Sequence, residues 1–143
     1  MPNISINCLL DGKEQGGDFN MSATILVVDD RVGIRRLLQE VLLGAGYKVL
    51  TASGGKEAME ITRQNNVDMV LLDMKMSGMD GLETLTELKK ESPHLSIIIM
   101  TAYEELEVLK EAERRGAAGY ISKPFDIEEL KRIIAEKLRA ISA

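Results

Sequence analysis

Five polar residues come directly after four short apolar runs of the chain, and their side chains are of three chemical kinds. They are the carboxylates of Asp29, Asp30 and Asp73, the hydroxyl of Thr101 and the ammonium group of Lys123. If the apolar runs are neighbouring parallel strands, all five side chains lie at one edge of a sheet. Such a set can hold a divalent cation together with a phosphoryl group.

The three carboxylates would repel one another if they lay close together, and a bound divalent cation relieves that repulsion. Mg²⁺ prefers oxygen ligands and is commonly held by one or two carboxylates beside a phosphate. A carboxylate can also attack phosphorus and form an aspartyl phosphate. Catalysis of such a transfer consists mostly of positioning and charge neutralisation. We therefore expect Mg²⁺ (or Mn²⁺), Lys123 and Thr101 each to bind one phosphoryl oxygen.

Stretches of helical periodicity separate the apolar runs. In the first stretch, apolar residues recur at the spacing of one helix face: Ile34, Leu37, Leu38, Val41 and Leu42. Weaker or similar patterns mark four further helices at 58–62, 82–88, 106–112 and 127–138. Asp126 is a good N-cap for the last helix, and Asp80-Gly81 reads as a turn and helix start.

The alternation of strands and helices predicts an α/β fold, a doubly wound parallel sheet of five strands with five helices on its two faces. The strands at 25–28, 69–72 and 97–100 are almost entirely Ile, Leu, Val and Met, as expected of strands buried on both faces. The second and fifth strands are more polar and are expected at the edges, which favours the order 2-1-3-4-5. In that order ligands bind at the carboxyl ends of the strands.

Composition narrows the class of protein. The chain has 143 residues, of which 45% are hydrophobic and 29% charged, an ordinary globular balance. Its net charge of −5 argues against binding nucleic acid or an anionic membrane by bulk electrostatics, and no apolar run approaches a membrane span. Cys8 is the only cysteine, which excludes an internal disulfide. We expect a cytoplasmic protein with no nucleic-acid or membrane partner.

The two ends of the chain carry separate expectations. Residues 1–22 contain scattered glycines and polar residues, and we expect a disordered N-terminal extension before a domain at 23–143. Gly16-Gly17-Asp18 can be encoded by a ribosome-binding sequence, so Met21 is a candidate start of translation. The chain ends at Ala143 soon after the fifth helical stretch, so we expect its output to be another protein.

The polar residues and their neighbours resemble the receiver domain of response regulators. The resemblance rests on Asp29-Asp30, on Asp73 within the stretch 71–81, on Met100-Thr101-Ala102 and on Lys123-Pro124-Phe125. It implies a flavodoxin-like receiver fold with a phosphoacceptor at Asp73. It also implies metal ligation by the three carboxylates and by the backbone carbonyl of Lys75, switching through Thr101 and Tyr120, and a cis peptide between Lys123 and Pro124.

The stretches 29–35, 72–75, 100–103 and 123–127 are similar to the stand-alone phosphorelay regulator that controls sporulation in endospore-forming bacteria. That resemblance implies two partners, a sensor histidine kinase that supplies phosphate and a histidine phosphotransferase that receives it. We expect the residues bordering the acidic pocket to meet the helical histidine domain: Arg31, Gly33, Ile34, Arg35, Leu37, Tyr103 and Phe125. Lys75 and Tyr103 are candidates for setting the lifetime of the phosphate.

Two other functions stay open. Tyr120 stands where the sporulation regulator carries a histidine, which favours a chemotaxis-type stand-alone regulator that binds a target protein when phosphorylated. A phosphatase with an aspartyl phosphate intermediate would need a cap and a second acid, and no insertion supplies either. We therefore expect a phosphoacceptor and not an enzyme, with at most Mg²⁺-dependent self-phosphorylation and self-dephosphorylation. His94 precedes the fourth strand, on the edge opposite Asp73, so the donor histidine must belong to a partner.

Overall fold

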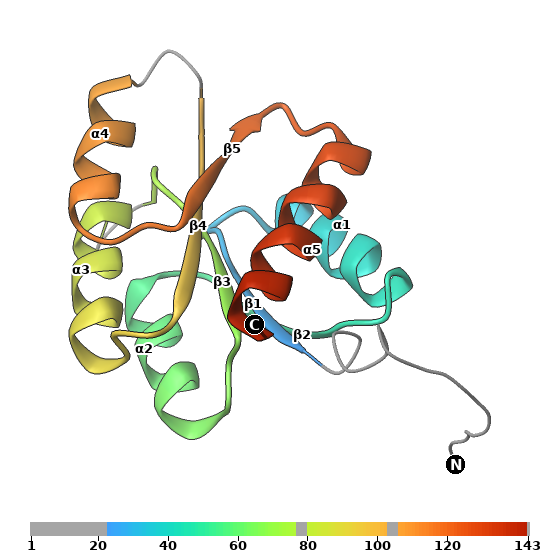
Figure 1. Cartoon of the computed structure of the whole chain (residues 1–143), viewed down its shortest axis with the longest axis horizontal. Coiled ribbons are helices and arrows are strands. Elements are labelled where there is room, and N and C mark those ends of the chain that lie inside the picture. Colours follow the sequence, from blue (N-terminus) through green and yellow to red (C-terminus); the bar gives the residue numbers. More distant parts are fainter. Residues whose placement is uncertain (1–22, 77–79, 103–105, 143) are drawn as a thin grey trace.

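The computed structural model describes residues 23–76, 80–102 and 106–142, which form one parallel sheet with helices on both faces (Figure 1). Its strands are β1 (Thr24–Val28), β2 (Lys48–Ala52), β3 (Met69–Asp73), β4 (Ser96–Ala102) and β5 (Gly119–Lys123). Its helices are α1 (Val32–Gly44), α2 (Gly55–Gln64), α3 (Gly81–Glu91), α4 (Leu106–Arg114) and α5 (Ile127–Ser142). The strand order is β2-β1-β3-β4-β5, which confirms the predicted fold.

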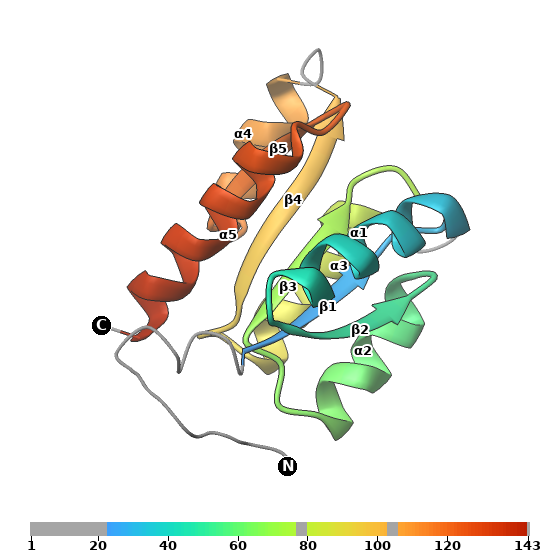
Figure 2. The ribbon, with the colours of Figure 1, turned by 90° about the vertical axis from the view of Figure 1, so that its right-hand side faces the viewer.

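The central strands are buried on both faces because their alternate side chains enter two separate cores. Leu26 and Val28 pack with residues of α2, α3 and α4, whereas Ile25 and Val27 pack with residues of α1 and α5. Figure 2 shows α1 and α5 on the same side of the sheet. The polar strands β2 and β5 lie at the edges, as the sequence pattern predicts.

The helix ends follow the predicted signals. The Asp126 side chain accepts hydrogen bonds from the backbone N–H of Glu128 and Glu129, and Asp80 accepts one from the N–H of Glu83 at 2.8 Å. Both aspartates therefore act as N-caps. Gly46 and Gly116 follow α1 and α4 with φ of 99° and 108°, the left-handed conformation that commonly closes a helix.

Some predictions lie outside the described residues. They concern the disordered extension at 1–22 and the role of Tyr103 in docking and in phosphate lifetime. Among the helices that are described, none combines the length and the apolar character required to cross a bilayer.

Candidate functional site

The carboxyl ends of β1, β3, β4 and β5 surround a cavity of about 270 Å³. Parallel register produces this meeting point, because Asp73 pairs with Met100 on β4 and Ala102 pairs with Lys123 on β5. The residues that line the cavity are Asp30, Arg31, Asp73, Met74, Lys75, Met100, Thr101 and Lys123.

Asp73 is the most constrained carboxylate of this cavity. Its side chain is 2% exposed, and its Oδ1 accepts a hydrogen bond from Lys123 Nζ at 2.7 Å. Its Oδ2 is the single buried side-chain oxygen without a hydrogen-bond partner among the described residues. Burial raises the pKa of Asp73, and the nearby Asp29 adds to that rise, against the opposing hydrogen bond and charge of Lys123. Keeping this buried carboxylate ionised therefore costs free energy, and a bound ligand can lower that cost.

Asp29 is completely buried beside Asp73 and is surrounded by positive groups. Its Oδ1 accepts from the Arg31 backbone N–H at 2.9 Å and from Arg31 Nε at 3.3 Å. Its Oδ2 accepts from Arg31 Nη2 at 3.3 Å and from Lys123 Nζ at 3.4 Å. Arg35 Nη1 donates to the Asp29 backbone carbonyl at 2.6 Å.

These arginine contacts were not predicted, since Arg31 and Arg35 were expected only on the partner surface. One signal in the sequence could have indicated them. An aspartate commonly accepts a hydrogen bond from the backbone N–H two residues later, which places Arg31 beside Asp29.

The three acidic residues of the cavity lie close enough to share one ion. Asp29, Asp30 and Asp73 each offer a carboxylate oxygen, and these oxygens lie within 4.8 Å of one another. Asp29 and Asp73 are buried, whereas Asp30 is exposed to solvent. Clustered carboxylate oxygens, one of them unpartnered and buried, fit the ligand preferences of a hard divalent cation.

Among the remaining predicted residues, Thr101 and Lys123 line this cavity, whereas Tyr120 and Gly33 do not. Thr101 is 2% exposed at the end of β4, and the peptide bond between Lys123 and Pro124 is cis. Tyr120 lies on β5 and is 51% exposed. Gly33 is exposed in the first turn of α1.

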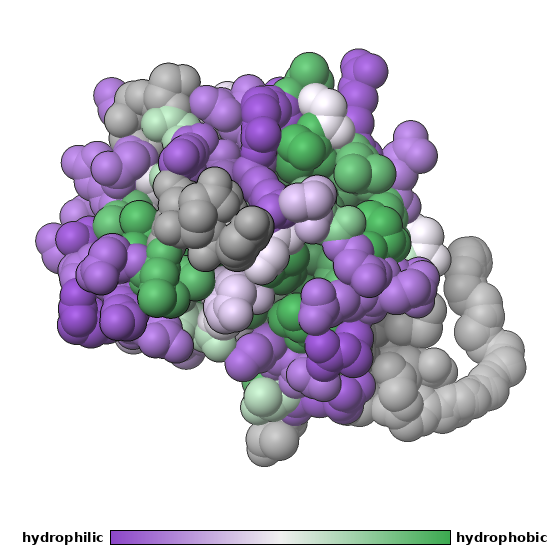
Figure 3. All heavy atoms as spheres, turned by 90° about the horizontal axis from the view of Figure 1, so that it is seen from above, coloured by the Kyte–Doolittle hydropathy of each residue, from purple (hydrophilic) through white to green (hydrophobic). Residues whose placement is uncertain are grey.

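A groove of about 610 Å³ adjoins the cavity between α1 and the start of α5. Figure 3, seen from above the view of Figure 1, shows hydrophobic side chains gathered on the side of α1 and α5. The groove is lined by Arg31, Ile34, Leu37, Lys123, Pro124, Phe125 and Ile127. Two of these, Arg31 and Lys123, also line the acidic cavity, so the groove and the cavity share a rim.

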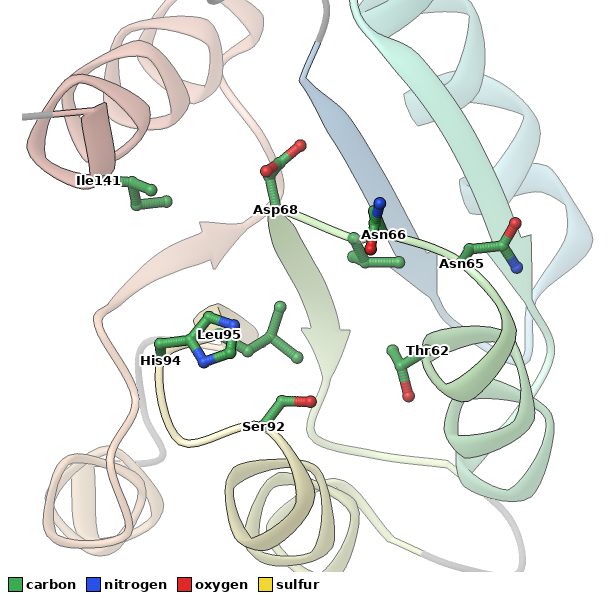
Figure 4. A pocket seen from close by; sticks show the side chains of 9 residues that line it. Thr62, Asn65, Asn66, Asp68, Ser92, His94, Leu95 and Ile141 are labelled. Carbon is green, nitrogen blue, oxygen red and sulfur yellow. The ribbon is translucent and has the colours of Figure 1, made fainter.

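The histidine lies at the other end of the sheet. His94 precedes β4 and lines a cavity of about 480 Å³ with residues that include Thr62, Asp68 and Ser92 (Figure 4). This position, at the amino ends of the strands, is the one expected from the sequence.

Comparison with known proteins identifies the family of the chain. Residues 25–135 match the response regulator receiver domain. The chain is 43% identical over 118 residues to sporulation initiation phosphotransferase F of Bacillus subtilis, covering 82% of this chain and 95% of that protein. It is 42% identical over 114 residues to the transcriptional regulatory protein ZraR of Klebsiella oxytoca, covering 80% of this chain but 26% of that longer protein.

A solved structure of chemotaxis protein CheY4 from Vibrio cholerae has a TM-score of 0.77 and 31% identity, covering 80% of this chain and 98% of that one. The match to the receiver domain begins within β1 and ends within α5, so it contains every element between them. The resemblance inferred from the sequence is thereby confirmed, and the chain belongs to the family of response regulator receiver domains.

Proposed function

We propose that this chain accepts a phosphoryl group on Asp73 from the phosphohistidine of a sensor histidine kinase and passes it to a histidine phosphotransferase. The observation that carries the proposal is the state of Asp73, a buried carboxylate with one oxygen on Lys123 and the other unpartnered. The relative that the chain matches over 95% of its length is named a sporulation phosphotransferase, which supports relay as the output.

The transfer needs a nucleophile and charge neutralisation, and the chain supplies both. A carboxylate oxygen of Asp73 forms a bond to phosphorus while the bond from phosphorus to the histidine nitrogen breaks, and that nitrogen keeps the electron pair. Lys123 Nζ lies 2.7 Å from Asp73 and would pair with a phosphoryl oxygen, and the hydroxyl of Thr101, which lines the same cavity, would donate to another. The return to a second histidine is the same step reversed.

Mg²⁺ belongs to the same proposal. Asp29, Asp30, Asp73 and the backbone carbonyl of Lys75 would hold it, with Mn²⁺ as a substitute. When bound, the ion neutralises charge on the transferring group. Without a partner the chain would carry out at most Mg²⁺-dependent self-phosphorylation and self-dephosphorylation, so we propose a phosphoacceptor protein and not an enzyme. We propose that it acts in the cytoplasm.

The groove beside the cavity supports docking of a helical histidine domain. Its apolar residues include Ile34, Leu37 and Phe125, and Leu37 is 44% exposed although it lies on a helix that packs on the sheet. An apolar strip next to a reactive carboxylate suits a partner that must bring its own histidine to Asp73. The residues proposed for this surface are Arg31, Gly33, Ile34, Arg35, Leu37 and Phe125.

A second candidate is a chemotaxis-type regulator that binds a target protein through a different face. The exposed ring of Tyr120 favours it, because an aromatic side chain on the edge strand β5 can turn inward when Thr101 moves toward a phosphoryl group. The similarity to a chemotaxis protein of Vibrio cholerae also supports this candidate.

One experiment separates the candidates. The protein is labelled with a small acyl phosphate and Mg²⁺, and transfer to an isolated histidine phosphotransferase domain is timed. Relay predicts labelling followed by rapid transfer. Leu37→Ala should keep labelling but slow transfer. Leu43→Ala, which changes another exposed leucine of α1 that lies outside the groove, should change neither. Labelling without transfer to any histidine domain would favour the chemotaxis-type candidate.

A further inference from the structure

Arg31, which we propose for the docking surface, also makes three hydrogen bonds to Asp29 inside the acidic cavity. Its backbone N–H and its Nε both donate to Asp29 Oδ1, at 2.9 and 3.3 Å, and its Nη2 donates to Oδ2 at 3.3 Å. Asp29 is fully buried, whereas the Arg31 side chain is 54% exposed. The guanidinium group therefore covers both oxygens of a buried carboxylate from the solvent side.

The charge of Arg31 acts on the whole acidic cavity. Its hydrogen bond to Asp29 raises the pKa of Arg31, and the charges of Asp29, Asp73 and Asp30 raise it further, so the guanidinium lies in the field of all three carboxylates. Lys123 supplies the second positive charge, at 2.7 Å from Asp73 and 3.4 Å from Asp29. Two positive side chains of the chain itself, Arg31 and Lys123, therefore already offset two of the three negative charges that fit a cation.

We propose that Arg31 competes with the divalent cation for Asp29 and so sets the metal affinity of the site. The inference rests on the metal site of the proposed function. An oxygen of Asp29 that bonds Arg31 is not available as a metal ligand, and a guanidinium group beside a divalent cation is repelled by it. Arg31 must therefore release at least one oxygen of Asp29 when the site is loaded.

The released side chain has a place to go, because Arg31 also lines the apolar groove. Its exposure means that leaving Asp29 requires no rearrangement of the core. The groove and the acidic cavity share Arg31 on their rim, so loading the cavity changes the charge presented to a docking partner.

Calorimetric titration of the full chain with MgCl₂ tests the competition. Arg31→Gln removes the positive charge and the paired hydrogen bonds of the guanidinium group to the two oxygens of Asp29. We expect this variant to bind Mg²⁺ at least about fivefold more tightly than the unchanged protein. Arg31→Lys keeps the charge but cannot cover both oxygens of Asp29, and we expect an intermediate affinity. Arg36→Gln is the matched control, because Arg36 is exposed on α1, the helix that begins directly after Arg31, and the change in net charge is identical. Its affinity should stay within about twofold, since exposed charges are screened.

Thermal unfolding gives a second readout that does not depend on phosphorylation. The rise in Tm on adding Mg²⁺ should be larger for Arg31→Gln than for the unchanged protein, because stabilisation by a ligand grows as its Kd falls. Equal or weaker Mg²⁺ binding by Arg31→Gln overturns the competition and leaves the metal site intact. If Arg31→Gln does not fold, an affinity of Arg31→Lys equal to or below that of the unchanged protein overturns it. No binding by any folded protein of the series overturns the metal site itself.

Discussion

The two ends of the sheet each hold a polar cavity, but the charges in them are treated differently. At the carboxyl end, Asp29 and Asp73 are buried, and an oxygen of Asp73 has no partner. At the amino end, Asp68 and His94 are exposed, and Asp68 Oδ2 accepts a hydrogen bond from the Thr24 backbone N–H at 2.8 Å. Burial of carboxylates therefore costs desolvation free energy at the carboxyl end of the sheet, whereas the exposed groups at the amino end carry no such cost.

This difference in desolvation favours the carboxyl end as the functional end, which cavity size and residue type do not. The amino-end cavity is the larger, about 480 against 270 Å³, and it contains the histidine, a serine and a threonine. His94 is exposed and Ser92 is partly exposed, while the Thr62 hydroxyl donates to the Met59 carbonyl at 2.9 Å, so these groups carry little desolvation cost. A buried carboxylate oxygen without a partner, such as Asp73 Oδ2, costs roughly 1–3 kcal/mol, and such a cost persists where a ligand or a reaction uses it.

The same substitution at the two ends should give the largest contrast. Asp73→Asn removes the nucleophile, so labelling by a small acyl phosphate and Mg²⁺ should be abolished. Asp68→Asn makes the same chemical change at the amino end, where the amide oxygen can still accept from Thr24 N–H, and labelling should be unchanged. The labelled fraction is measured by intact mass. Labelling of Asp73→Asn at the rate of the unchanged protein would contradict the assignment.

Two glycines offer a contrast in stability. A Cβ on Gly81 would lie 2.5 Å from Met74 Cα and 2.7 Å from the Asp73 carbonyl oxygen, whereas a Cβ on Gly33 would meet nothing within 4 Å. Gly81→Ala should therefore cost about 2 kcal/mol of unfolding free energy, since the chain behind the site must shift. Gly33→Ala should gain about 0.5–1 kcal/mol in its helix. Urea denaturation measures both, and equal effects would show that the close approach at Gly81 is not maintained.

Much of the carboxyl end could be predicted from the sequence because topology positions it. The near-continuous apolar strands fix which strands are central, and each polar residue follows its strand directly, so Asp73 and Lys123 had to meet at one edge. The caps at Asp80 and Asp126 were readable because their hydrogen bonds are local.

What could not be predicted depends on packing between elements. Leu37 and Leu38 are adjacent and equally apolar, yet Leu38 is fully buried while Leu37 lines the groove. The rotation of α1 about its own axis decides which leucine faces the sheet, and packing against the sheet and α5 sets that rotation. The ion pair of Arg31 with Asp29 could not be predicted either, because an exposed arginine side chain can extend in many directions.

The raised pKa of Asp73 predicts that protonation of this carboxylate stabilises the metal-free protein as the pH falls. A carboxylate with a pKa above its unfolded value binds more protons when folded, so its contribution to stability is lost as the pH rises through the folded pKa. Asp73→Asn should then be more stable than the unchanged protein at pH 7, which a higher Tm would show. The difference should vanish toward pH 4, and Mg²⁺ should reduce it at pH 7. A less stable Asp73→Asn at pH 7 would show that the bond to Lys123 outweighs the burial.

The smallest effect is expected at His94, although a histidine beside a serine and an aspartate invites a role in chemistry. Its side chain is exposed and lies at the amino end of β4, while Asp73 lies at the carboxyl end of β3 (Figure 4). A proton carrier must come within hydrogen-bond reach of the reacting group, and the length of the sheet prevents that. His94→Gln should leave the labelling rate and the rate of phosphate loss unchanged and alter stability by less than about 0.5 kcal/mol. Slower labelling by this variant would mean that the amino end of the sheet communicates with Asp73, and the contrast between the two ends would then fail.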